Sequence, residues 1–318
     1  MDLLLGEVMA TLRDIKRRIG AVANTAKITQ AMRMVSSAKL KRAQEAIINA
    51  RPYSFLLKSN LERLIGSIGE EYYHPLLEHR TEIKNICLVV ITSDRGLCGS
   101  FNSNLIRFVG KTINEEIKPK YPNARISMIR IGKRGISGIK FGDIDYIKNI
   151  SGISGRIDYK VVDEISKFII NGYVEGTFDK VVFFFNEFKN ILIQVPKYFN
   201  LLPFERSTEV ESYFKPKDKH SVETQKALQK NLIYIFEPDQ QTILDKLLPL
   251  YIENQILRIL LESNAAEHAA RRMAMENATN NAKELIKHLE LVYNKERQAA
   301  ITKEMLEIVG GANALKGQ

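Results

Sequence analysis

The sequence has no tryptophan, only two cysteines and no long hydrophobic run. The last two shortages each exclude a class of protein. Cys87 and Cys98 are too few for a disulfide framework, so we expect a reducing compartment. No stretch approaches the ~20 consecutive apolar residues of a membrane-spanning helix. The first eight residues carry an acidic residue where a signal peptide needs basic ones, so export is not indicated. Membrane association is therefore expected only through partners or surface contacts.

Glycine and proline are absent from the sixty residues between Leu250 and Val309. As one α-helix, at ~1.5 Å per residue, this stretch would be roughly 90 Å long. A compact domain cannot bury a helix of that length, so it must lie against a second long helix or reach into a partner. The sequence therefore indicates a mechanical or architectural role.

A second long helix is predicted near the start of the chain, from Leu12 to about Ile65. Its first apolar residues recur three and four positions apart, which places them on one helix face: Leu12, Ile15, Ile19, Val22 and Ala26. We expect Ile28, Met32 and Val35 to continue the stripe in a shifted register. Gly20 weakens this helix by about 1 kcal/mol and Pro52 can kink it, but neither ends it.

The last helix repeats the same spacing. Its predicted stripe comprises Ile252, Ile256, Ile259, Ala266, Ala270, Met273, Leu285, Leu289 and Val292. Asn277, Asn280 and Asn281 interrupt the stripe, and we expect them to fix the register as buried polar residues. The two terminal helices are predicted to form one antiparallel coiled coil.

The middle of the chain alternates between strand and helix patterns. The predicted strands are Ile86–Ile91, Ile126–Ile131 and Lys180–Phe185, with an antiparallel edge strand at Ile191–Val195 after a turn at Asn186–Asn190. Helices are predicted over Leu105–Ile117 and Val161–Ile170, with a turn at Gly132 and Gly135. The fold class is thus α/β: a three-layer Rossmann-like domain inserted between two coiled-coil helices.

The predicted organisation has five parts. They are an N-terminal extension (1–8), the first coiled-coil helix (9–66), a linker (67–83), the α/β domain (84–238) and the last helix with its tail (239–318). Within the domain, Glu205–Lys230 is polar and is predicted to be a loop excursion, and Ile233–Phe236 could be one more strand.

Motifs for chemistry are weak. The loop Ser93–Ser100 follows a predicted strand, where backbone N–H groups can bind phosphate, but it has two glycines where the dinucleotide fingerprint has three. Gly110-Lys111-Thr112 is a chance match to the end of a P-loop. The five histidines never stand at metal-ligand spacing, so we expect no catalytic, cofactor-binding or metal residues. A nucleotide-dependent enzyme remains one alternative.

Positive charge gathers on the first helix. The segment from Arg13 to Glu45 has only two acidic residues, Asp14 and Glu45, but nine basic ones: Arg13, Lys16, Arg17, Arg18, Lys27, Arg33, Lys39, Lys41 and Arg42. Such a stripe can be a solvated face, contact an acidic protein or bind nucleic acid. Against nucleic acid, the stripe lacks interleaved aromatic residues and a recognition-helix module. A basic coiled-coil nucleic-acid-binding protein is the other alternative.

Three blocks of sequence resemble the gamma subunit family of the F-type, proton-translocating ATP synthase. The first is MATLRDIKRRIGAVANTAKITQAMRMVSSAKLKRAQ from Met9, and the second is ITSDRGLCGSFNSN at Ile91–Asn104. The third comprises AAEHAARRMAMENATNNAKELI and then LVYNKERQAAITKEMLEIVGGA, which ends at Ala312. The blocks occur in the family's order, and the family's usual start matches Met9 rather than Met1.

The resemblance implies a rotor that is not itself an enzyme and needs no cofactor. Its terminal helices would form a shaft inside a hexamer of alpha and beta subunits, with the α/β domain beside the epsilon subunit on the membrane c-ring. Proton flow through that ring would then drive ATP synthesis. In the opposite direction, ATP hydrolysis would drive proton flow. One copy per complex is implied, peripheral on the cytoplasmic side of the bacterial inner membrane, with no nucleic acid and no direct membrane contact.

The resemblance also implies which residues contact the beta subunits. The residues at matching positions are Met32, Arg33, Lys39, Lys41, Arg95, Arg297, Gln298, Thr302 and Glu304. The apolar tip of the last helix, with Ile308, Val309, Ala312 and Leu315, would turn in a hydrophobic bearing. Lys39, Lys41 and Glu304 could equally be ordinary surface residues of a coiled coil.

Overall fold

The computed structural model describes residues 11–67, 74–78, 80, 82–142, 144–153, 155, 157–204 and 237–316, with side chains as far as residue 310. The chain divides into two compact units, which are described separately. The central unit is Ser37–Arg271, and the terminal unit combines Met1–Ser36 with Arg272–Gln318. The predicted extension (1–8), the polar excursion and the strand at Ile233–Phe236 lie outside the described residues.

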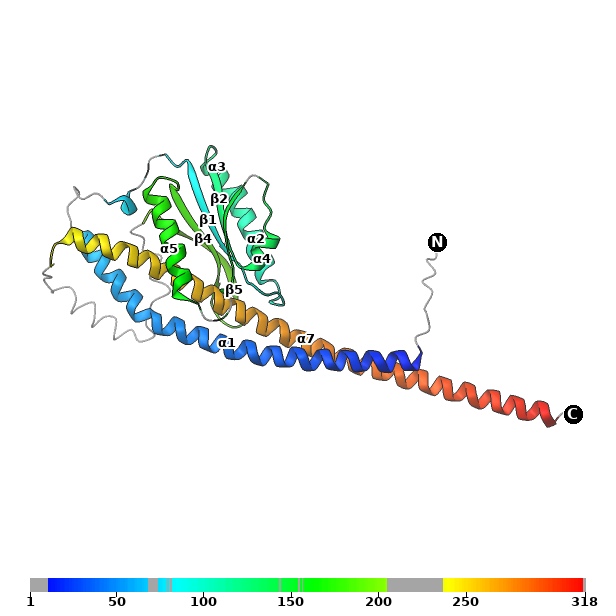
Figure 1. Ribbon diagram of the computed structural model, residues 1–318. Helices are drawn as coiled ribbons and strands as arrows, with labels where there is room; N and C mark the ends of the chain where they lie inside the picture. The colour runs from blue at the N-terminus through cyan, green and yellow to red at the C-terminus, as the bar shows by residue number, and fades with distance from the viewer. Residues whose placement is uncertain are drawn as a thin grey trace. The chain divides into compact units, whose positions relative to one another are not determined.

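Two long helices, α1 (Leu12–Ser67) and α7 (Gln240–Lys316), contribute to both units (Figure 1). Helix α1 begins at the predicted residue and continues through Pro52. Helix α7 begins after Asp239, whose carboxylate accepts a hydrogen bond of 2.8 Å from the backbone N–H of Thr242. An Asp at this position satisfies an N–H that the first helical turn leaves unpaired, which explains why the helix starts there. Within the described ranges, none of the helices combines the length and hydrophobicity that a membrane span requires.

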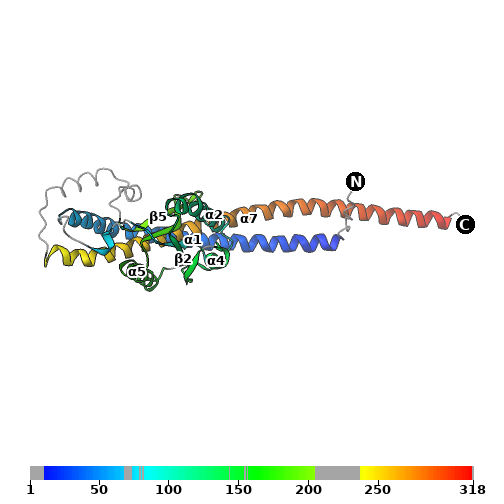
Figure 2. The same cartoon turned by 90° about the horizontal axis from the view of Figure 1, so that it is seen from above.

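In the terminal unit, α1 and α7 run antiparallel in close contact, as Figure 2 shows. Thr29 hydrogen-bonds to Thr279, and four residues further along α1 Arg33 contacts Glu276, which lies earlier on α7. The predicted stripe is confirmed over its first part, since Ile15 and Ala26 are buried and Leu12, Ile19 and Val22 are half-buried. The antiparallel pairing of the terminal helices is therefore correct.

The second part of the predicted stripe is wrong. Ile28 and Val35 are 61% and 56% exposed, and the buried positions are instead Thr29 and Ser36, which keep the original three-four spacing. Both hydroxyls donate to carbonyls on their own helix, Thr29 to Ala26 at 3.1 Å and Ser36 to Met32 at 2.8 Å. Because these bonds satisfy the hydroxyls locally, polar residues can be buried without shifting the register.

The asparagines of α7 also differ from the prediction. Asn277, Asn280 and Asn281 are exposed, so they do not fix the register as buried residues. Leu285 is exposed as well, whereas Met275, Thr279, Ala282 and Leu289 are the buried positions of this part of α7. The asparagines lie on the outer face because the seam passes through Thr279 between them.

The central unit contains one five-stranded sheet with the order β3-β2-β1-β4-β5. The strands are β1 (Asn85–Ile91), β2 (Arg125–Ile131), β3 (Asp145–Ile150), β4 (Lys180–Phe188) and β5 (Gln194–Leu202). All neighbouring strands are parallel except β4 and β5, which form an antiparallel pair. Strand β3 was not predicted; it is an edge strand whose alternating burial makes its apolar signal weak.

Helices cover both faces of the sheet, as predicted for a three-layer domain (Figure 1). The short helix η1 (Pro75–Leu77) precedes β1, and the helical elements between the strands are α2 (Phe101–Thr112), the π-helical turn η2 (Ile113–Ile117), α3 (Lys118–Lys120), α4 (Lys133–Gly138) and α5 (Tyr159–Val174). On β1, Cys87 and Val89 face a core shared with α5 and parts of α1 and α7, while Leu88 and Val90 face α2. The continuous apolar run of β1 is thus explained by burial on both faces.

The hairpin between β4 and β5 lies further along the chain than predicted. Asn186 and Glu187 belong to β4 and are 2% and 6% exposed, so the predicted turn at Asn186–Asn190 is wrong in its first residues. Asn186 is buried because its amide donates to the carbonyl of Phe101 at 3.2 Å. The turn instead follows Asn190, whose side-chain oxygen accepts from the N–H groups of Leu192 and Ile193 at 2.9 and 2.8 Å.

A second difference concerns the predicted turn at Gly132 and Gly135. Gly132 adopts a φ of +92°, and a side chain there would lie 2.2 Å from the carbonyl oxygen of Thr92. Gly135, however, lies inside the short helix α4, where its N–H donates to the Thr92 hydroxyl at 2.7 Å. Glycine at these two positions allows the loops after β1 and β2 to approach closely.

Candidate partner-binding site

In the central unit, Arg271 of α7 binds the loop that follows β1. Its Nη2 atom donates to the carbonyl oxygens of Arg95 and Gly96 at 2.9 and 3.3 Å, and Nε reaches Gly96 at 3.4 Å. An added Cβ at Gly96 would lie 2.9 Å from the end of the Arg134 side chain, which would have to move aside. The glycine-containing loop therefore holds the chain's own helix.

The loops at this edge of the sheet are also joined to one another. Asp94 accepts hydrogen bonds of 3.1 Å from the backbone N–H groups of Lys133, after β2, and Gly152, after β3. Asn264 of α7 donates to the carbonyl of Gly155 at 2.7 Å. Three loops and one helix thus form a single hydrogen-bonded mount, defined here as Asp94, Arg95, Gly96, Lys133, Gly152, Gly155, Asn264 and Arg271.

The mount occupies the place where open α/β sheets bind ligands. That place is the crevice at the carboxyl ends of the strands where the strand order reverses, here between β1 and β4. Cys98, Phe101 and Phe188 fill it together with Ala266 and Ala270 of α7. Side chains of the chain itself, most of them apolar, therefore occupy this position.

Charged groups of α7 are buried beside the mount. Arg271 pairs with Glu267 at 2.7 Å, and their side chains are only 10% and 5% exposed. His268 is 2% exposed, and burial, together with the positive charges of Arg271 and Lys39, lowers the pKa of His268 to about 4. His268 is therefore neutral at pH 7, which leaves the Arg271–Glu267 pair as the charged contact.

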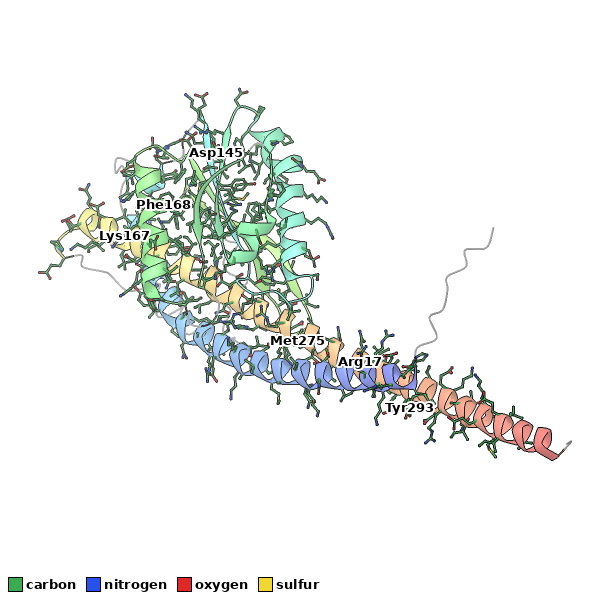
Figure 3. The ribbon with its side chains drawn as sticks, turned by 45° about the vertical axis from the view of Figure 1, so that its right-hand side comes forward. Arg17, Asp145, Lys167, Phe168, Met275 and Tyr293 are labelled. Atoms are coloured by element: carbon green, nitrogen blue, oxygen red, sulfur yellow. The ribbon has the colours of Figure 1, made fainter. Side chains whose placement is uncertain are left out.

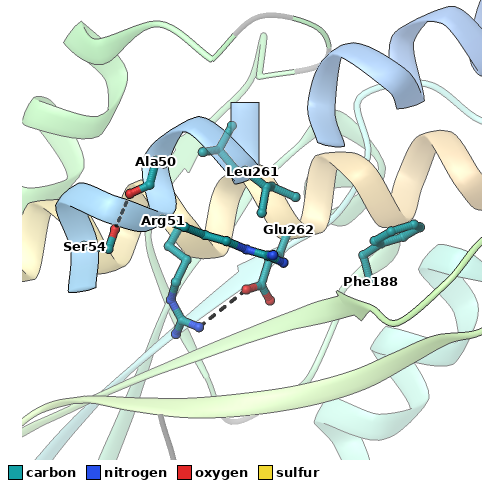
Figure 4. Close-up of a pocket in the computed structure, with 8 residues that line it drawn as sticks. Ala50, Arg51, Ser54, Phe188, Leu261 and Glu262 are labelled. Carbon is teal, nitrogen blue, oxygen red and sulfur yellow. Dashed lines mark hydrogen bonds and ion pairs between the residues drawn. The ribbon is translucent and has the colours of Figure 1, made fainter. Parts of the chain in front are cut away.

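A second buried network lies earlier on α7. Arg258 donates to Gln255 at 3.0 Å and contacts Glu262 at 3.4 Å beside a cavity of about 70 Å³, drawn in Figure 4. Burial raises the pKa of Glu262 despite the opposing charge of Arg258. Arg51 and Ser54 also line the cavity, which therefore has polar as well as apolar walls and is large enough for ordered water.

In the terminal unit, Met32 and Arg33 lie at the border of the helix seam. Both are half-buried, and Arg33 contacts Glu276 across the seam at 3.7 Å. Arg17, further along the basic face, is 85% exposed and contacts Asp14 on its own helix at 3.5 Å (Figure 3). At Arg17 the predicted basic stripe is therefore exposed, and its ion pair lies within α1.

Three other predicted partner residues belong to the central unit. Lys41 is exposed and lies 4.0 Å from Glu45 on its own helix, and Lys39 is half-buried. The side chain of Arg95 is exposed while its carbonyl binds Arg271. Lys39 and Lys41 therefore lie on α1 and Arg95 on the loop after β1, so two separate elements present these residues.

The predicted residues near the end of α7 are all exposed. They are Arg297, Gln298, Thr302 and Glu304, and Thr302 donates to the carbonyl of Gln298 at 2.9 Å. At the tip, Ile308 and Val309 are 70% and 55% exposed. Ala312 and Leu315 belong to the same helix, but their side chains lie outside the description.

Sequence reasoning missed the mount. Its residues come from three loops and α7, and only the fold brings Asp94 near Gly152 or Arg271 near Gly96. The signal that could have found it was the position of Glu267 and Arg271 four residues apart on one helix face, with alanines between them that leave room for another segment to pack. Across the described ranges, no three His, Cys, Asp or Glu side chains could together hold a metal ion.

Comparison with known proteins gives matches along nearly the whole chain. A family model described as ATP synthase matches residues 11–315. The ATP synthase gamma chain of Chlorobium phaeobacteroides (strain BS1) is 43% identical over 98% of this chain and 100% of its own length. The ATP synthase gamma chain of Desulforamulus reducens is 42% identical over 97% of this chain and 100% of its own.

Solved structures agree. The chain is similar to one from the central stalk and c-ring of the Tetrahymena thermophila mitochondrial ATP synthase, with a TM-score of 0.54 and 26% identity over 79% of this chain and 99% of that one. A chain of the Euglena gracilis mitochondrial ATP synthase has a TM-score of 0.62 and 19% identity over 96% and 94%, which shows the shared fold. On the family match and on full-length relatives above 40% identity, the chain belongs to the ATP synthase gamma chain family.

Proposed function

We propose that this chain turns as the central rotor of a proton-translocating ATP synthase, and that its rotation couples proton flow through a c-ring to ATP synthesis or hydrolysis. As a member of the gamma chain family it is a non-catalytic, central-stalk subunit of that complex. The shaft would be residues 9–66 and 239–318, joined by the linker 67–83 to the α/β domain of residues 84–238.

The observation that carries this proposal is the exposed apolar end of α7. In the terminal unit, α7 continues past the start of α1 (Figure 2), and the apolar residues beyond that point have no cover from α1: Ile301, Met305, Leu306, Ile308 and Val309 are each at least half exposed. Contiguous exposed apolar side chains of this kind mark an interaction surface. A surrounding sleeve of subunits would bury them on all sides of the helix.

The predicted contact residues supply the electrostatic part of the interaction. We assign Met32, Arg33, Lys39, Lys41, Arg95, Arg297, Gln298, Thr302 and Glu304 to contacts with beta subunits, and Ile308, Val309, Ala312 and Leu315 to a hydrophobic bearing. Exposed ion pairs are worth less than about 1 kcal/mol each, so they can form and break as the shaft turns. Basic residues such as Arg33 and Lys41 would then steer acidic loops without holding them in place.

Unequal contacts explain how a subunit without a catalytic site can control catalysis. A single chain has different residues on each side, so it presents a different face to each of three equivalent partner sites. Contact with this chain can shift a partner's conformational equilibrium only if the chain binds one conformation of the partner more tightly than the other. Turning the chain would move the favoured conformation from one site to the next.

The complex proposed for the chain has one copy of it. Its partners would be the alpha-beta hexamer, the epsilon subunit and the c-ring, with the membrane reached only through them. We place it on the cytoplasmic side of the bacterial inner membrane. The Tetrahymena structure, described as a central stalk with a c-ring, supports the assignment of a ring partner.

Co-purification tests the proposal. The chain is expressed with the alpha and beta subunits of its own source, and the recovered complex is expected to contain one copy per hexamer and to hydrolyse ATP, whereas the purified chain alone hydrolyses none. Failure to recover a hexamer would contradict the proposal. A salt-sensitive gel shift of DNA or RNA by the isolated chain, with no hexamer recovered, would instead support the nucleic-acid alternative.

A further inference from the structure

A cavity of about 650 Å³ lies in the central unit between α1, α7 and the segment that leads into α5. This volume is typical of small-molecule sites in proteins. The mount borders it, since Gly155 and Asn264 belong to its lining. Apart from Lys39, the residues assigned to partner contacts do not belong to this lining, so those contacts do not explain the cavity.

Small side chains on α1 create the space. Ala43, Ala46 and Ala50 line the cavity at three- and four-residue spacing, so methyl groups occupy the middle of the α1 wall, beside the polar Asn49. The opposite wall is formed by the larger apolar residues Leu257 and Leu261 of α7. The walls between the two helices are therefore mainly apolar.

Positive charge is concentrated at one end. Two contacts between the antiparallel helices show which residues lie at the same end of the cavity. Ala43 packs with Ala265 and Ala269, and Ser54 hydrogen-bonds to Asn254. Lys39 and Arg42 therefore lie at one end and Tyr53 and Asn254 at the other, with Tyr53 roughly 16 Å from Arg42 and roughly 21 Å from Lys39 along α1 at ~1.5 Å per residue. The described lining includes no Asp or Glu, so nothing in it offsets the charge of the basic end.

We propose that this cavity binds an elongated amphipathic anion. The anionic head would pair with Lys39 and Arg42, and the apolar body would extend along Ala46, Leu257 and Leu261. A ligand in this place contacts α1, α7 and the residues before α5 at once, so it would restrain the helix pair at the mount. The proposal does not depend on the rotor function, because it concerns binding to the chain itself.

The test is calorimetric titration of the purified full-length chain with dodecanoate, below the concentration at which it forms micelles. Saturable binding of one molecule per chain is expected. Decanoate, shorter by two methylenes, is expected to bind roughly tenfold more weakly, because each buried methylene contributes about 0.8 kcal/mol. Dodecyl maltoside, with the same chain and a neutral head, is expected to bind at least tenfold more weakly than dodecanoate.

Variants locate the site. The double substitution Lys39→Gln with Arg42→Gln is expected to lower the affinity for dodecanoate at least tenfold, and Ala46→Phe to abolish binding by filling the cavity. Lys41→Gln is the matched control, because Lys41 carries the same charge on the same helix but is not part of the lining. Circular dichroism confirms that each variant is folded.

Two results would overturn the proposal. One is an unchanged affinity in the folded Lys39→Gln, Arg42→Gln variant, which does not depend on Ala46→Phe folding correctly. The other is equal affinity for dodecanoate and dodecyl maltoside, which would mean unspecific partition onto apolar surface. Neither result bears on recovery of the alpha-beta hexamer, so the proposed rotor function is tested separately.

Discussion

Thr29 of α1 and Thr279 of α7 hydrogen-bond across the buried seam of the terminal unit, with 2.8 Å between their hydroxyl oxygens. Each hydroxyl also lies within reach of a carbonyl on its own helix, Ala26 for Thr29 at 3.1 Å and Met275 for Thr279 at 2.7 Å. Either hydroxyl can therefore donate to the other while the second donates to its own helix. The seam thus tolerates a polar layer in the middle of an apolar stripe.

Replacing this threonine pair tests the polar layer. Thr29→Val or Thr279→Val alone is expected to cost about 1 kcal/mol of unfolding free energy, because the hydrogen bond between the helices is lost. The double variant is expected to cost less than the sum, since two valines form an apolar pair of similar shape. Urea unfolding of all four proteins measures the coupling. Exposed Thr25→Val is the control, and strictly additive costs would contradict the account.

Arg271 is expected to be the most sensitive residue of the mount. Arg271→Gln removes the bonds to Arg95 and Gly96 and leaves the buried carboxylate of Glu267 without its partner. Loss of one member of a buried ion pair costs about 3–5 kcal/mol, so a large drop in unfolding free energy is expected. Arg272→Gln, next in sequence and half-buried, is the matched control. Equal stability of the two variants would show that the mount does not hold the domain.

His268 is expected to make the central unit sensitive to acid. Its folded pKa of about 4 lies below the ordinary value near 6.5, so between these values the unfolded chain takes up a proton that the folded chain does not. The stability contributed above pH 6.5 is therefore lost as the pH falls toward 4, by about 3 kcal/mol in total.

His268→Gln should remove this part of the pH dependence, measured as unfolding free energy between pH 7 and pH 4. The control is His288→Gln, because His288 is exposed on the same helix. A slope that is unchanged by His268→Gln, or equally reduced by His288→Gln, would show that His268 is not the titrating group.

Arg297 and Gln298 are expected to act only in the assembled complex. Both side chains are exposed, so Arg297→Ala with Gln298→Ala should leave the fold of the chain intact. Because the proposed contacts with beta subunits are lost, ATP hydrolysis and coupled synthesis should fall severalfold. Lys287→Ala, exposed and earlier on α7, is the control for a general effect of surface truncation. Unchanged hydrolysis and coupling in the double variant would refute the role of the pair.

The repeated three-four spacing predicted both long helices and their antiparallel pairing, because that signal is regular and lies within each helix. The prediction placed the seam on Ile28 and Val35 because it considered only the hydrophobicity of the side chains. It could not show that Thr29 and Ser36 satisfy their hydroxyls on the preceding turn and so stay on the buried face. Local hydrogen bonds decided between two stripes of the same helix.

Contacts between distant residues could not be predicted in the same way. Asn186 has the composition of a turn, yet it is buried in β4 because its amide meets the carbonyl of Phe101. Arg271 reaches Gly96 only after the sheet has brought the loop after β1 to α7. The partner residues were predicted from family resemblance, because contacts with another subunit leave no pattern in this chain alone.

Rotation of the assembled complex tests the central claim most directly. Cys87 and Cys98 are buried, so a single cysteine introduced at exposed Lys160 of α5 gives one accessible attachment point for a rod-shaped probe. With the hexamer fixed to a surface and ATP supplied, the account predicts continuous rotation of the probe in one direction, in three equal steps per turn. A probe that stays fixed relative to the hexamer while ATP is hydrolysed would contradict it.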